Sequence, residues 1–157
     1  MTLEEHLLNL LDGGHAYDTF DDIVGSFKES DRGLVPLPGV RSAWQILEHM
    51  RRSLRDILEF SLNFGGTYKA KRWPEDYWPE NVAPKPGEWD AAAVAFLMDR
   101  ETLKGLCRSD EIYDPLPWGD GKTLLREILL AADHQAYHLG QLVQIKEWIT
   151  AGRNGNR

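Results

Sequence analysis

The chain has 157 residues, of which 42% are hydrophobic and 27% are charged, and its formal net charge is −7 at pH 7. The length and the balance of residue types are ordinary for a globular protein and predict one domain over residues 1–157 with a single core. The negative charge argues against binding to nucleic acid or to anionic lipid, because both need a basic surface.

Features of the sequence that report on location favour the cytoplasm. The N-terminal residues include Glu4 and Glu5 and no basic cluster, so we expect no signal peptide. No apolar run approaches the roughly 20 residues of a membrane span, so we expect no membrane association. The single cysteine, Cys107, cannot form an internal disulfide and is predicted to be a packing residue rather than a nucleophile.

The first of four segments with helical periodicity spans residues 2–27. Thr2 and Glu5 predict a capping box, in which the hydroxyl and the carboxylate each accept from a free backbone N–H. Gly13 and Gly14 are a potential interruption, because paired glycines weaken a helix.

The second helix is predicted over residues 42–62, with a capping box from Ser42 and Gln45. The third is predicted from residue 89 or 90 to Cys107. Its side chains expected to face inward are Val94, Leu97, Met98 and Leu103.

The fourth helix is predicted to begin after the capping residue Thr123, to reach about Ile149 and to end at Gly152. Its apolar stripe is Leu124, Ile128, Ala131, Gln135, His138, Leu142, Ile145 and Ile149. No segment alternates with the period of a strand. The chain is therefore predicted to be an all-α four-helix bundle with long connections.

Three of the five histidines form a candidate metal site. His134 and His138 are four residues apart, so they share one helix face and can reach one ion about 2.0–2.1 Å from each nitrogen. His49 lies near the apolar face of the second helix, and a bundle core is a common place for metals. Three protein ligands leave one position open, as in catalytic sites. The alternative, that these are core histidines satisfied by hydrogen bonds, stays open from the pattern alone.

The remaining titratable candidates are weaker. His6 and His15 are predicted to be solvated or capping residues. Glu48 and Asp133 each precede a candidate ligand and point about 100° away from it on a helix. Either could hold an imidazole in one tautomer, although for Glu48 a solvent-facing charge is the favoured interpretation.

The motif elements are Trp44-x4-His49 in the second helix and His134-x3-His138-x-Gly140-Gln141 in the fourth. Together they resemble the DinB/YfiT-like superfamily over essentially the whole chain. The resemblance implies a four-helix bundle of up-down-down-up connectivity, a divalent metal held by His49, His134 and His138, and a homodimer. Many members carry a histidine just before the last ligand and a basic residue just after it. Here those positions are Tyr137 and Leu139.

The enzyme hypothesis is a metal-dependent, thiol-dependent S-transferase that uses a low-molecular-weight thiol, or a hydrolase, acting on a small-molecule substrate. Tyr137 or Asp133 would assist proton movement, and no further cofactor-binding residues are predicted. Zinc or nickel would suit the three imidazoles, with iron or copper as alternatives. The competing hypothesis is a non-catalytic, metal-stabilised, ligand-binding or stress-response dimer that uses a surface near Trp148 and Ile149.

The long connection over residues 63–88 is predicted to fold over one end of the bundle and to form part of a pocket wall. Its aromatic residues Trp73, Tyr77 and Trp78 would otherwise expose a large apolar patch. Its four prolines restrict the conformations available to the unfolded segment.

Overall fold

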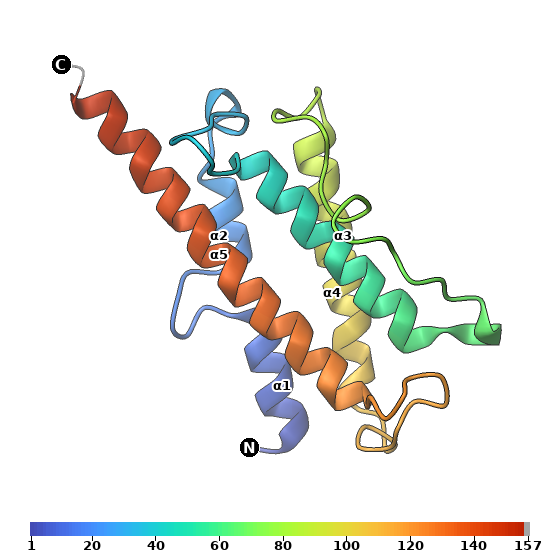
Figure 1. Cartoon of the computed structure of the whole chain (residues 1–157). Coiled ribbons are helices and arrows are strands. Elements are labelled where there is room, and N and C mark those ends of the chain that lie inside the picture. The colour runs from blue at the N-terminus through green and yellow to red at the C-terminus, as the bar shows by residue number, and fades with distance from the viewer. Residues whose placement is uncertain (156–157) are drawn as a thin grey trace.

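The computed structural model describes residues 1–155, and within that range it contains five α-helices and no strands (Figure 1). The helices are α1 Leu3–Asp12, α2 Phe20–Gly25, α3 Ala43–Leu62, α4 Glu88–Leu106 and α5 Leu124–Gly155. Two 3-10 turns lie at Glu29–Asp31 and Phe64–Gly66. Among the described helices, none combines the length and the apolar character that crossing a membrane requires.

The connectivity of the bundle is up-down-down-up, as predicted. In Figure 1, α1 and α2 together form the first ascending element, α3 and α4 both descend, and α5 ascends. Because α3 and α4 run in the same direction, the chain must return along the bundle between them. The long connection over residues 63–87 makes that return.

The predicted first helix is divided into α1 and α2. The capping box of Thr2 and Glu5 is present at the start of α1. Gly13 and Gly14 then adopt φ values of 72° and 82°, a left-handed conformation that a helix cannot continue through. Thr19 restarts the helix, because its side chain accepts a hydrogen bond from the backbone N–H of Asp22.

Helix α3 agrees with the prediction at both ends, and its Ser42–Gln45 capping box is present. For α4, the predicted inward face is wrong at two positions, since Val94 is 56% exposed and Met98 is 66% exposed. The hydrophobic side chains that α4 buries are Trp89, Ala92, Phe96 and Leu103. Phe96 stacks on Phe20 of α2, with ring centroids 4.4 Å apart, and this contact orients the helix.

All eight predicted stripe positions of α5 are buried. Thr123 caps the helix, because its hydroxyl accepts from the backbone N–H of Arg126 at 3.2 Å. The predicted end at Gly152 is wrong, since α5 continues to Gly155. In this extra turn Arg153 donates to the buried carboxylate of Asp31 at 3.1 Å, which stabilises the helix beyond the glycine.

Candidate metal centre

His49, His134 and His138 converge between α3 and α5. One ring nitrogen of each lies within 4.8 Å of a ring nitrogen of the other two. The closest pair is Nε2 of His49 and Nε2 of His134, which are 3.1 Å apart. His49 and His138 are buried and His134 is half-buried, so the cluster faces the interior. The predicted candidate ligands are therefore brought together by the packing of two helices.

Hydrogen bonds orient two of the three imidazoles. Nδ1 of His49 lies 3.0 Å from the carbonyl oxygen of Tyr77, which can only accept, so this nitrogen carries the proton. Nδ1 of His138 lies 2.7 Å from Oε1 of Gln141, to which it donates in the same way. Both rings consequently present the lone pair of Nε2 toward the cluster, as metal-binding imidazoles do.

Burial keeps the three imidazoles neutral at pH 7. Desolvation lowers the pKa of His49 to about 4, with an opposing effect from the Tyr77 hydrogen bond. Desolvation also lowers the pKa of His134 to about 3, and the neighbouring His138 and His49 add to the shift. The pKa of His138 is likewise lowered, mainly by burial. Neutral imidazoles offer lone pairs, so little proton competition is expected at neutral pH.

The donor set fits a divalent cation. Two nitrogens bound to one tetrahedral zinc ion at about 2.0–2.1 Å would be roughly 3.3 Å apart. The 3.1 Å between Nε2 of His49 and Nε2 of His134 is close to that spacing. Three imidazoles leave a position for an exogenous group. The cluster could therefore hold a metal ion.

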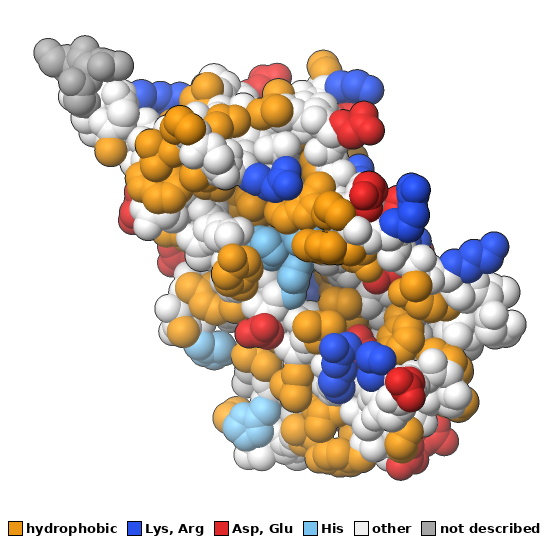
Figure 2. Space-filling model, in the orientation of Figure 1, with side chains coloured by type: hydrophobic (Ala, Val, Ile, Leu, Met, Phe, Trp, Pro, Cys, Tyr) orange, Lys and Arg blue, Asp and Glu red, His pale blue; other side chains and the backbone are white. Residues whose placement is uncertain are grey.

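The cluster opens into a cavity of about 810 Å³, within the size range of small-molecule sites. Figure 2 shows histidine side chains in a hollow of this face, bordered by hydrophobic side chains. Tyr137 lines the cavity, with its ring centroid 4.9 Å from that of His138. Asp133 is exposed and is not a lining residue, so Tyr137 is the better placed of the two candidates for proton transfer. His6 and His15 are exposed, as predicted.

The α3–α4 connection forms part of the cavity wall, as predicted, although it lies along the side of α3 rather than over an end of the bundle. The ring centroids of Trp73, Tyr77 and Trp78 lie 6.2, 6.5 and 3.8 Å from that of His49. In order along the connection, Lys71 contacts Glu59, Trp78 contacts Arg52, and Val82 contacts Ser42, the N-cap residue of α3. The connection therefore runs antiparallel to α3.

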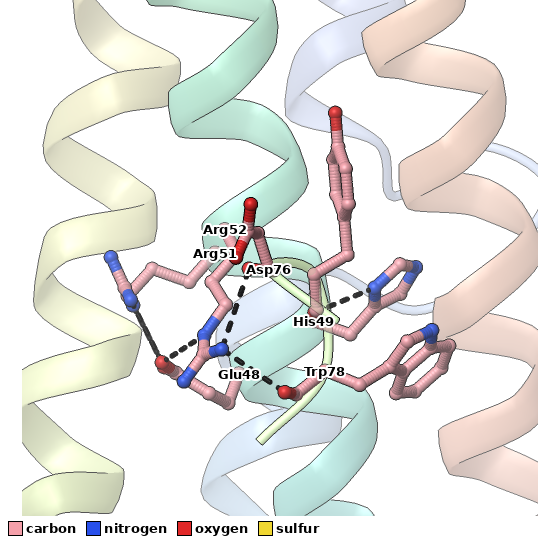
Figure 3. Close-up of polar contacts among 7 residues, drawn as sticks. Glu48, His49, Arg51, Arg52, Asp76 and Trp78 are labelled. Atoms are coloured by element: carbon pink, nitrogen blue, oxygen red, sulfur yellow. Dashed lines mark hydrogen bonds and ion pairs between the residues drawn. The ribbon is translucent and has the colours of Figure 1, made fainter. Parts of the chain in front are cut away.

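A partly buried ion cluster holds the connection against α3 (Figure 3). The guanidinium of Arg52 donates to Glu48 at 2.8 Å and to the carbonyl oxygen of Trp78 at 3.0 Å. Arg51 donates to both oxygens of the Glu48 carboxylate, at 2.7 and 2.8 Å. The favoured interpretation of Glu48 as a solvent-facing charge is wrong, because these donors satisfy its carboxylate in a site that is only 7% exposed.

The side chain of Tyr77 is fixed as well. Its hydroxyl donates to Asp56 at 2.6 Å, and the hydroxyl of Tyr68 donates to the other oxygen of the same carboxylate at 3.1 Å. Burial, followed by the charge of Asp56, raises the pKa of Tyr68 to about 12, and burial also raises the pKa of Tyr77. Both hydroxyls are therefore protonated donors. Tyr77 links Asp56 to His49 through its hydroxyl and its backbone carbonyl.

A comparison with family models identifies this arrangement. The model of the DinB superfamily matches residues 14–142, which include all three histidines and the α3–α4 connection. The chain belongs to the DinB superfamily. No curated protein and no solved structure is found to match the chain. Superfamily membership and the three-histidine cluster are both compatible with a metal-binding enzyme.

Several residues of this DinB site have roles there that the sequence analysis did not predict. Gln141 lies three positions after His138, a spacing that places it on the same helix face, so its contact was open to prediction. Asp56 is a polar residue on the buried face of α3, and this position was a weaker indication that it belongs to the site. Arg41 and Trp148 line the DinB cavity through contacts that only the packed structure defines.

Two earlier expectations concern residues around this DinB site. Cys107 is 4% exposed and lies outside the cavity, and burial raises the pKa of its thiol, so it is a packing residue as predicted. Ile149 is 6% exposed and belongs to the core, which excludes it from an exposed dimer surface. Leu139, at the position where many members carry a basic residue, is fully buried and packs in the core.

Proposed function

We propose that this DinB protein is a metal-dependent enzyme that binds zinc or nickel through His49, His134 and His138 and acts on a small molecule. The observation that carries the proposal is the convergence of three neutral imidazoles at a cavity of about 810 Å³. A structural metal needs no such cavity, whereas an enzyme needs room for a substrate beside the ion. Transfer to a low-molecular-weight thiol is the favoured reaction, and hydrolysis is the second.

When bound, a divalent ion would supply positive charge that favours the deprotonated form of a thiol or of water at neutral pH. The chain contributes the orientation of the imidazoles, through Gln141 and the carbonyl of Tyr77. Tyr137 supplies a hydroxyl on the cavity wall, which we propose accepts or returns a proton. Because Cys107 lies outside the cavity, the reacting thiol must come from a second substrate.

The proposed activity is tested by loading the protein with zinc or nickel and screening electrophiles such as 1-chloro-2,4-dinitrobenzene with glutathione or cysteine, beside esters without thiol. We expect wild type to form thiol-dependent product at least about tenfold faster than a His134→Ala/His138→Ala variant. The variant cannot hold the divalent ion, so it lacks the positive charge that favours the thiolate. Ester cleavage without thiol would favour the hydrolase. Full metal loading of a folded protein without any turnover would favour the non-catalytic, metal-stabilised dimer.

We also propose that the protein is a homodimer, as the superfamily resemblance implies. Val94 and Met98 are one turn apart on α4 and are both largely exposed, which makes this face a suitable contact. Light scattering should give a mass near twice the 17.9 kDa of one chain. A Val94→Glu/Met98→Glu variant should shift the mass toward the monomer while its circular dichroism stays unchanged. A monomeric wild-type protein would contradict the proposal.

A further inference from the structure

Arg41 occupies an unusual position on the cavity wall. Its Cζ lies 3.9 Å over the ring of Trp78. The other face of that indole is covered by His49, whose ring is parallel to it with centroids 3.8 Å apart. The two neighbours must lie on opposite faces, because the imidazole already fills the space on its own side. One indole therefore separates the guanidinium from a candidate metal ligand.

The guanidinium of Arg41 is held in place and its donors are free. Among the described residues, no hydrogen bond or ion pair engages it, and the side chain is exposed at the cavity. Arginine has five N–H donors in a rigid plane that match a carboxylate or sulfonate in a bidentate pair. Stacking on Trp78 limits the rotation of the side chain, which lowers the entropy lost when an anion binds.

The cavity lining carries one cation and one carboxylate, whose formal charges cancel. The charged groups that line it are Arg41 and Asp56, and Asp56 already accepts from two tyrosine hydroxyls. Although the chain carries a net charge of −7, the charged lining group without a hydrogen bond or ion pair among the described residues is the cation Arg41. A bound divalent ion would add further positive charge.

Most of the remaining wall is apolar or aromatic, including Trp73, Leu130, Ile145 and Trp148, and its polar side chains include Ser53, Gln141 and Gln144. Such surfaces bind the body of an organic ligand, while one or two polar groups orient it. The three histidines line the same cavity, and a single indole separates Arg41 from His49, so a ligand bound at Arg41 lies near the cluster.

We propose that the cavity binds small organic anions with an apolar or aromatic body, that the guanidinium of Arg41 binds the anionic head, and that the apolar wall holds the body beside the histidines. This inference rests on the proposed function and names the substrate class for it. Its test does not require turnover or metal, so the two proposals can fail separately.

The test compares two fluorescent probes with similar bodies. 8-Anilinonaphthalene-1-sulfonate carries an anionic head, and N-phenyl-1-naphthylamine lacks it. Both are titrated into metal-free and zinc-loaded full-length protein, for wild type, Arg41→Gln and Arg41→Lys. We expect Arg41→Gln to lower the affinity for the sulfonate probe at least about tenfold, which is the scale of a lost charge-assisted pair. Its affinity for the neutral probe should stay within about twofold of wild type. Arg41→Lys should retain part of the affinity, because it keeps the charge without the planar fork.

The matched control is Lys69→Gln, which removes the same charge from an exposed residue of the α3–α4 connection outside the cavity lining. It should leave both affinities unchanged. Equal binding of the sulfonate probe to wild type and Arg41→Gln would overturn the proposal. An equal loss for both probes would also overturn it, because Arg41 would then only shape the apolar wall. Circular dichroism of each variant checks that the helices are intact.

Discussion

Replacing His134 and His138 with alanine should abolish stoichiometric metal binding. We expect about one zinc or nickel ion per wild-type chain, purified without a histidine tag, and less than about one tenth of that in the double variant. The reason is that one imidazole, His49, cannot hold the ion against solvent once both α5 ligands are gone. Elemental analysis and competition with a chromogenic chelator measure the difference.

The matched control for this experiment is a His6→Ala/His15→Ala variant. It also loses two histidines, but both are exposed and lie outside the cluster. Its metal content should equal that of wild type. Equal metal content in wild type and in the His134→Ala/His138→Ala variant would disprove the site. Retained helical circular dichroism in that variant would exclude unfolding as the cause of metal loss.

Replacing Arg52 with methionine should loosen the α3–α4 connection and weaken metal binding. The substitution leaves Glu48 with one arginine partner fewer and removes the donor to the Trp78 carbonyl. We expect a loss of about 1–3 kcal/mol in the free energy of unfolding, because buried acceptors lose their partners. The Tyr77 carbonyl orients His49 from the same connection, so metal affinity should fall by about tenfold. Denaturant unfolding and metal competition measure the two effects.

Arg55→Met is the control for this variant. Arg55 lies on the same helix and pairs with the buried carboxylate of Asp99 at 2.8 Å. Its ion pair is with Asp99 of α4 and not with the α3–α4 connection, so its loss should lower stability by a similar amount and leave metal affinity within about twofold. Limited proteolysis should cut the connection faster in Arg52→Met than in Arg55→Met. If both variants bind metal equally tightly, the connection does not orient His49.

Local chemistry made much of this fold predictable. The capping boxes at Thr2 and Ser42 mark helix starts through contacts within four residues. The buried stripe of α5 follows from the helical period, because its apolar residues repeat along one face over the whole length. The same period places His134 beside His138. Histidines on the inward faces of two helices, together with the superfamily motif, were enough to predict which three residues converge.

Packing between elements defined the rest. The inward face of α4 depends on the contact of Phe96 with Phe20, which is distant in sequence. The last turn of α5 depends on Asp31, whose buried carboxylate attracts Arg153 past a glycine that would otherwise end the helix. The roles of Glu48, Arg52 and Arg41 arise where the α3–α4 connection meets α3. Such contacts join residues far apart in the chain, so their partners are set by the packed arrangement of helices and by burial, which no local pattern records.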